Sequence, residues 1–170
     1  AYLDEIGQSK VHVIAQRIVR ASPTARVWTL ACRLDELEDA TVRRLAQSHL
    51  PGADALCPSA TLLCAFTDSF AAQSRLNRLA LQLGVPLLAG AVYAEGRGVE
   101  LSFSAPGWTR ACVRCALGAR YRAVLDHPEA ASAVTSNGSP LWATARLNAA
   151  KHPIALAILH AMTDGDPEHP

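Results

Sequence analysis

The stretch Thr61-Leu62-Leu63-Cys64-Ala65-Phe66-Thr67-Asp68-Ser69 decides the fold of this chain. It opens with a short continuous apolar run, which predicts a strand buried on both faces. The run breaks at Thr67-Asp68-Ser69, and a helical pattern follows from Phe70 to Leu83. This order puts the carboxylate of Asp68 at the carboxyl end of a strand, where open α/β sheets place their ligand chemistry.

Further helices and strands are predicted on both sides of this stretch. They are helices over residues 11–19 and 36–50, a β-leaning segment over 26–34, strands over 85–92 and 99–104, and a late helix over 142–162. Gly84 follows the helix that ends at Leu83 and is expected to be its C-cap. Residues 99–104 alternate apolar and polar, which indicates antiparallel pairing with one exposed face. The order of elements predicts an α/β fold with a mainly parallel sheet and a late antiparallel element.

Length and composition limit the number of domains, the partners and the cellular compartment. A chain of 170 residues is expected to form one domain, residues 1–170, with a core of its own. Residues 108–138 show no convincing periodicity and predict a long loop with a cysteine knuckle and a helical turn around residues 116–125. Residues 164–170 predict a frayed tail. The formal net charge of +1 argues against nucleic acid or a membrane surface as a partner. Five cysteines, an odd and sparse set, favour a reducing compartment, so we expect a cytoplasmic protein.

Two charged residues are the first candidates for chemistry. Asp68 suits a cap for the helix that begins near Phe70, because carboxylates accept hydrogen bonds from free helix amides. It equally suits a magnesium-bound phosphate, because hard cations prefer oxygen ligands. Lys10 opens a helix, where the macrodipole disfavours a cation, so a nearby anion such as a nucleotide phosphate would compensate. The simpler interpretation of Lys10 is a solvated side chain.

The third candidate is the pair Cys112 and Cys115 in Cys112-Val113-Arg114-Cys115. One C-x-x-C motif supplies half of a structural zinc site, which needs four ligands. The remaining interpretations are a pair without metal and a redox pair. A thioredoxin-like redox motif should open a helix after a strand, and the sequence pattern does not predict that here.

These pieces, taken in order, resemble the ThiF/MoeB/HesA group, the bacterial relatives of ubiquitin-activating enzymes. The matching segments are residues 4–10, 66–70, 76–78, 83–87, 90–93, 96–98, 106–107 and 112–115. The resemblance implies a Rossmann-like fold and ATP-dependent adenylation of the C-terminal carboxylate of a small ubiquitin-like (β-grasp) protein or a peptide. It also implies a homodimer.

The resemblance assigns roles to single positions. The position of Lys10 contacts ATP phosphates, and the position of Asp68 binds Mg²⁺. Asn77 and Arg78 match a recurrent pair near the nucleotide, and Cys112 and Cys115 match one half of a zinc site. The implied chemistry is attack of a carboxylate on the α-phosphorus, with Mg²⁺ and cationic side chains neutralising the developing charge.

Three departures accompany the resemblance. The family's first strand and glycine-rich phosphate loop, and its second C-x-x-C, have no counterpart in these 170 residues. The stretch matching a catalytic-cysteine loop, residues 131–137, contains no cysteine. We therefore expect a fold that is incomplete on its N-terminal side, and no adenylation by this chain alone.

Two functions from different classes follow. The first is part of an ATP-dependent adenylyltransferase, and the second is a non-catalytic scaffold of the same fold that binds a partner subunit or peptide. A nicotinamide- or flavin-dependent oxidoreductase is disfavoured, because the sequence contains no G-x-G-x-x-G motif.

Overall fold

The computed structural model describes residues 5–47, 60–67, 69–93, 98–126 and 141–164. The chain divides into two compact units, Ala1–Glu38 and Asp39–Pro170. Each unit is described by itself.

The first unit contains helix α1, Lys10–Ala21, and a short 3-10 helix η2, Leu34–Glu36. The helix predicted over residues 11–19 is therefore confirmed. The backbone N–H of Ser22 closes α1 by donating to the Ile18 carbonyl at 2.8 Å. The β-leaning prediction for residues 26–34 is wrong, because the described residues of this unit contain no strand. A strand needs a neighbouring strand to complete its hydrogen bonds, and β-propensity alone does not supply one.

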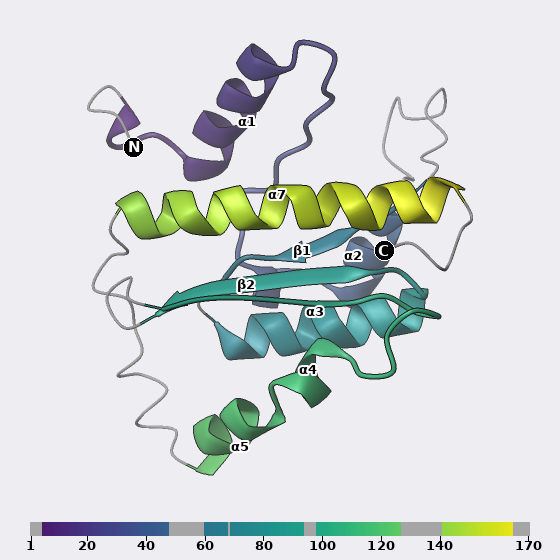
Figure 1. Ribbon diagram of the computed structural model, residues 1–170. Helices are drawn as coiled ribbons and strands as arrows, with labels where there is room; N and C mark the ends of the chain where they lie inside the picture. Colours follow the sequence, from purple (N-terminus) through teal and green to yellow (C-terminus); the bar gives the residue numbers. More distant parts are fainter. Residues whose placement is uncertain (1–4, 48–59, 68, 94–97, 127–140, 165–170) are drawn as a thin grey trace. The chain divides into compact units, whose positions relative to one another are not determined.

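The second unit is built on a three-stranded sheet in the order β1-β2-β3 (Figure 1). β1 spans Leu63–Ala65, β2 spans Leu87–Tyr93 and β3 spans Gly98–Ser104. β1 and β2 are parallel, with Cys64 opposite Leu88. β2 and β3 are antiparallel, with Gly90 opposite Leu101, so the late antiparallel element is confirmed.

Helices cover both faces of this sheet. α3, Phe70–Leu83, packs against β1 and β2, and α7, Leu141–Asp164, packs against β2 and β3. Figure 1 shows α3 and α7 on opposite sides of the strands. A short helix α2, Asp39–Ala46, contacts α3. α3 ends as predicted, with Gly84 in the left-handed conformation at φ 67°, which glycine adopts without steric cost.

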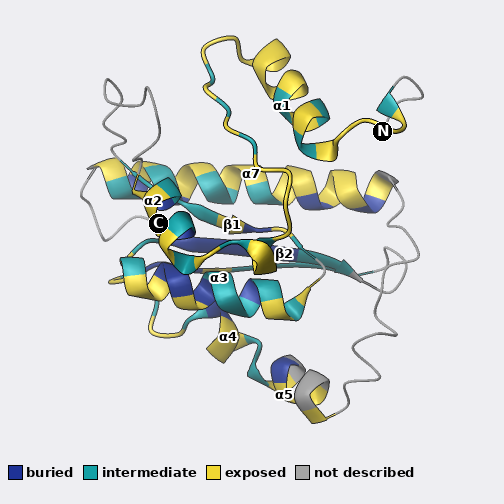
Figure 2. Ribbon diagram, turned by 180° about the vertical axis from the view of Figure 1, so that it is seen from behind, coloured by how far each residue is buried: buried dark blue, intermediate teal, exposed yellow. Residues whose placement is uncertain are grey.

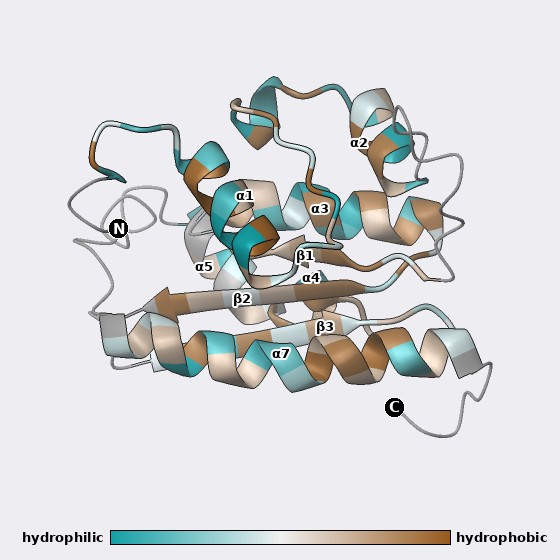
Figure 3. Ribbon diagram, turned by 90° about the horizontal axis from the view of Figure 1, so that it is seen from above, coloured by the Kyte–Doolittle hydropathy of each residue, from teal (hydrophilic) through white to brown (hydrophobic). Residues whose placement is uncertain are grey.

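The core lies between the sheet and α3. Its buried members are Ala65, Ala80, Leu87, Ala89 and Val113. Figure 2 shows buried residues along α3, and Figure 3 shows that β2 is largely hydrophobic. Side chains alternate along a strand, so the residues of β1 and β2 that do not face α3 face α7 instead.

Two expectations about burial and loops need correction. β1 is not buried on both faces: Ala65 is buried, but Cys64 is exposed. The short strand packs one face on the α3 core and leaves the other only partly covered. Residues 108–138 hold more helix than the predicted loop with one helical turn around residues 116–125, because α4, Val113–Ala116, and α5, Gly118–Asp126, lie within them. Helices this short give too few turns for a hydrophobic period to show in the sequence.

Some expectations fall outside the described residues. These are the rest of the predicted loop, residues 127–138, and the predicted tail after Asp164. Within the described residues, the helices are all too short or too polar to cross a membrane.

Candidate functional site

The corner between β1 and α3 is held by polar contacts on both sides of position 68. Ser69 is the N-cap of α3, and its Oγ accepts a hydrogen bond from the Ala72 backbone N–H at 3.2 Å. The backbone N–H of Ser69 donates to Thr67 Oγ1 at 3.2 Å. Asp68 itself lies outside the described residues. Among the described residues, the cap of α3 is therefore Ser69.

Gln73 strengthens the same corner, and the sequence prediction missed it. Its side chain is buried, and Nε2 donates to the Thr67 carbonyl at 2.7 Å. A buried polar side chain is stable only when it is hydrogen-bonded, so Gln73 ties the loop to the first turns of α3. The available signal was its place one helical turn before Asn77, on the inward side of a helix with an apolar face.

Asn77 is the most buried of the predicted site residues that the structure describes. Only 3% of it is exposed. Its side-chain amide donates to the Cys112 sulfur. Among the described residues no group donates to its Oδ1, so a buried carbonyl oxygen is left without a protein partner there. Such an oxygen carries the full cost of lost hydration, which marks Asn77 as a position worth testing.

Arg78, the next residue along α3, points to a different neighbour. Its guanidinium donates to Asp39 Oδ2 at 2.8 Å, and Arg75 donates to Asp39 Oδ1 at 2.7 Å. Hydrogen bonds from Arg75 and then Arg78 hold the pKa of the Asp39 carboxyl below its usual value. Asp39 is the first residue of α2, so these ion pairs join α2 to α3.

Cys112 and Cys115 lie side by side. Their Sγ atoms are 3.4 Å apart. Burial raises the pKa of the Cys112 thiol, but hydrogen bonds from the Cys115 backbone, Asn77, the Cys115 side chain and the Arg114 backbone outweigh burial and lower that pKa overall. The hydrogen bond and charge of Cys112 raise the pKa of Cys115, so the first proton leaves Cys112.

A zinc ion would fit these two sulfur atoms only in part. No group of three or more histidine, cysteine or acidic side chains in the described parts of the chain is arranged to hold a metal. Cys112 and Cys115 would supply two thiolate ligands, and a structural zinc site takes four.

A second polar group lies on the α7 side of the sheet. An open hollow of about 440 Å³ is lined by residues of β1, β2 and α7, among them Cys64 and Lys151. Lys151 Nζ lies 4.4 Å from the centre of the Phe66 ring, a cation–π distance. Burial of its sulfur raises the pKa of Cys64, and the positive Lys151 partly offsets this rise. Sequence reasoning did not find this group, because its members come from segments far apart in the chain.

Gly90 makes room for the Phe66 ring. A Cβ at that position would stand 3.0 Å from the ring and 2.9 Å from Leu101 Cδ2. Both distances are tighter than side chains normally tolerate. Glycine on β2 therefore leaves room for the Phe66 ring beside the strand.

Lys10 belongs to the first unit, whereas Asp68, Asn77, Arg78 and the cysteine pair belong to the second. Lys10 is exposed and is the first residue of α1.

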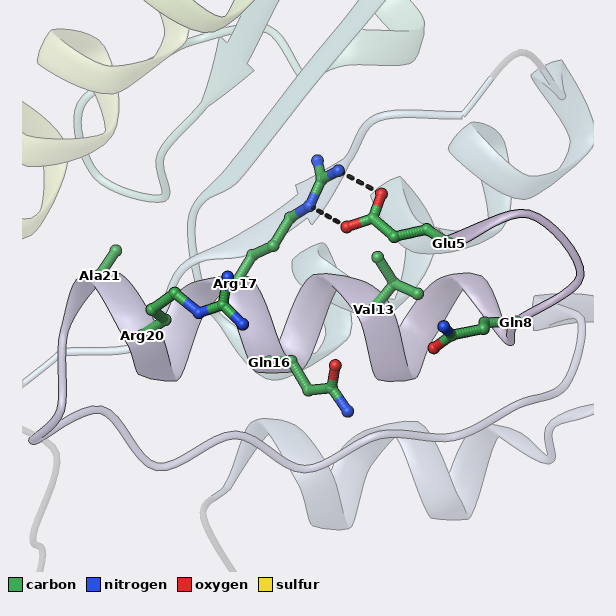
Figure 4. A pocket seen from close by; sticks show the side chains of 7 residues that line it. All are labelled: Glu5, Gln8, Val13, Gln16, Arg17, Arg20 and Ala21. Atoms are coloured by element: carbon green, nitrogen blue, oxygen red, sulfur yellow. Dashed lines mark hydrogen bonds and ion pairs between the residues drawn. The ribbon is translucent and has the colours of Figure 1, made fainter. Parts of the chain in front are cut away.

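The first unit has its own hollow of about 670 Å³ beside α1, in which Arg17 Nε donates to Glu5 Oε1 at 2.9 Å (Figure 4). Lys10 is not among the residues that line it. The ion pair between Glu5 and Arg17 joins the segment before α1 to the helix.

Within the second unit, the structure brings two predicted groups into contact. Asn77 meets Cys112, and this links the predicted nucleotide-site helix to the predicted zinc pair. Arg114 lies over the Tyr121 ring, 5.9 Å from its centre, and Tyr121 packs edge-on against Phe70 at 5.6 Å. Phe70 is the first residue of α3, so Tyr121 of α5 links Arg114 to the start of that helix.

Comparison with known families identifies this combination of elements. The model of the ThiF family matches residues 2–157, which is most of the chain. No curated protein and no solved structure matched the chain in the corresponding comparisons. The mixed sheet between α3 and α7 agrees with the Rossmann-like α/β fold expected from the resemblance. With its match extending from before α1 into α7, this chain belongs to the ThiF family.

Proposed function

We propose that this chain is part of an ATP-dependent adenylyltransferase that activates the C-terminal carboxylate of a small ubiquitin-like protein or a peptide. The observation that carries the proposal is the family match over residues 2–157, which includes both Lys10 and the segment around Asp68. In sequence, Asp68 stands between β1 and the N-cap of α3. Ligands of open α/β sheets bind at the carboxyl ends of strands, which is where this segment starts.

The proposal gives each residue a task. Asp68 would hold Mg²⁺ with its carboxylate oxygens, which suit a hard cation. Lys10 would neutralise phosphate charge as a point cation. Bound Mg²⁺·ATP would supply the electrophilic phosphorus and the pyrophosphate leaving group. Ser69 and Gln73 both bond to Thr67, so the residues on either side of position 68 are held together.

Asn77 and Arg78 would act less directly than the resemblance implies. Asn77 is buried against Cys112, and Arg78 is paired with Asp39. Both contacts fix α3, the helix that follows the proposed magnesium corner. We propose that these two residues position α3 near the nucleotide.

Partners follow from the same proposal. The activated carboxylate would belong to a β-grasp protein or peptide, and the chain would work as a homodimer in the cytoplasm, where thiols stay reduced. Static light scattering tests the dimer, and a monomer at micromolar concentration would contradict it. Elemental analysis of the purified protein tests for zinc at Cys112 and Cys115.

Magnesium-dependent ATP binding is the direct test. Titration calorimetry with ATP, with and without Mg²⁺, should show tighter binding with the metal. Asp68→Ala should remove about tenfold of the magnesium-dependent affinity, or about 1.4 kcal/mol. Asp126→Ala, at the exposed end of α5, is the matched control and should leave binding unchanged. Equal magnesium dependence in Asp68→Ala would refute the assigned role.

Lys10 allows a parallel test, because the chain has only two lysines, Lys10 and Lys151. Lys10→Gln should weaken ATP binding, and Lys151→Gln should not.

A non-catalytic scaffold is the second candidate function. It is favoured by the contacts of Asn77 and Arg78, which serve the packing of α3. The scaffold predicts no magnesium-dependent ATP binding, and it predicts binding of a partner that Asp68→Ala leaves unchanged. The calorimetric titration therefore separates the two functions.

A further inference from the structure

The cysteine pair has the arrangement of a reversible dithiol. Cys112 is the N-cap residue of α4 and Cys115 lies in its single turn. The motif follows strand β3 and opens a helix, which the sequence pattern did not predict. The Sγ–Sγ separation of 3.4 Å must shrink to about 2.05 Å to form a disulfide, a change that small side-chain rotations can make.

The backbone around the pair is anchored. Val113, between the two cysteines, is fully buried in the core cluster. The backbone N–H of Ala116 donates to the Cys112 carbonyl at 3.0 Å, and the N–H of Leu117 donates to the Val113 carbonyl at 3.0 Å. The Asn77 amide also holds the Cys112 sulfur from α3. A thiol fixed this close to its neighbour reacts with it at a high effective concentration.

Both cysteines can be reached from solvent, as thiol–disulfide exchange requires. Cys115 is exposed, and Cys112 is partly exposed. A small disulfide can therefore reach the pair from solvent.

We propose that Cys112 and Cys115 form a reversible intramolecular disulfide, with a low-molecular-weight disulfide such as glutathione disulfide as the oxidant. One cysteine thiolate attacks the small disulfide and forms a mixed disulfide, which releases one glutathione. The second cysteine attacks the protein sulfur of that mixed disulfide and releases the second glutathione. The two cysteines together lose two electrons and two protons, and one glutathione disulfide is reduced to two thiols.

Oxidation has two structural consequences. The disulfide removes both thiolates, so the pair can contribute to a metal site only when it is reduced. The Asn77 amide also loses its thiolate acceptor, on the helix that follows the β1–α3 corner. This inference does not rest on the proposed adenylation, because it needs only the two sulfur atoms and their anchored turn.

The test uses the full chain in a glutathione buffer at millimolar thiol, followed by acid quenching, alkylation and peptide mapping. The Cys112–Cys115 disulfide should exceed mixed disulfides at these two positions by about tenfold or more. Cys32, which is exposed, serves as the internal control and should carry only glutathione or remain reduced.

Two variants sharpen the result. In Cys115→Ser, Cys112 has lost its partner and should accumulate as the mixed disulfide, and Cys112→Ser should trap Cys115 in the same way. In the wild-type chain, separate mixed disulfides on Cys112 and Cys115 would overturn the proposal. So would a pair that stays reduced in a buffer that modifies Cys32.

Discussion

Replacing Asn77 by leucine should stabilise the folded chain, although Asn77 is buried. Leucine has the same branched shape as asparagine but larger terminal groups, so crowding offsets part of the gain. The change removes the Oδ1 that has no partner among the described residues. This removes a desolvation penalty of about 1–3 kcal/mol from the folded state. It also removes the hydrogen bond to Cys112, which costs about 1 kcal/mol. The expected net gain is about 1 kcal/mol.

Asn148→Leu is the matched control. Asn148 lies on α7 and is exposed, so the same substitution there changes helix propensity without changing a buried polar group. Asparagine and leucine differ in propensity by about 0.5 kcal/mol, and subtracting the control removes this contribution. The difference between the two variants then reports the burial of Asn77 alone.

Urea unfolding followed by far-ultraviolet circular dichroism measures both variants. The midpoint for Asn77→Leu should rise above that of Asn148→Leu without a change in slope. A loss of 1 kcal/mol or more in Asn77→Leu, with a neutral control, would show that Oδ1 is satisfied in the folded protein and would refute the reasoning. If Asn77 positions α3 for nucleotide binding, the stabilised variant should also bind ATP more weakly, since functional residues often cost stability.

Three further predictions concern α3 and its neighbours. Leu79→Ala should lower the free energy of unfolding by about 2–5 kcal/mol, because Leu79 is fully buried. Leu81→Ala on the same helix should lower it far less, because Leu81 is 52% exposed. Equal losses of stability in urea unfolding would contradict this packing. Ser69→Ala should cost about 1 kcal/mol through loss of the N-cap, and a neutral result would mean that another group caps α3. The lowered pKa of Asp39 means that its pairing stabilises the fold above about pH 4 and that this contribution is lost as the pH falls through the folded-state pKa. Asp39→Asn should therefore flatten the acid limb of the stability profile, and an unchanged profile would show that the pairing does not contribute.

The sequence by itself determined the main elements and the family. The limits of α3 were predicted to the residue, because a polar break before the helix, an apolar face and a terminal glycine are all local signals, although the cap is Ser69 and the residue predicted to cap it was Asp68. The antiparallel β3 was predicted from its alternation, and the late helix from its apolar length. The ordered motifs carried the resemblance that the family match confirmed over residues 2–157. These features depend on neighbours within a few positions, which a sequence displays directly.

Only the tertiary structure decided which side chains meet. Asn77 and Arg78 are adjacent in sequence, yet the helix turns about 100° between them. One therefore contacts Cys112 and the other Asp39. The exposure of Cys64 and its position beside Lys151 depend on which helix covers each face of the sheet. Such contacts join segments far apart in the chain, and their partners become known only when the sheet and its helices pack together.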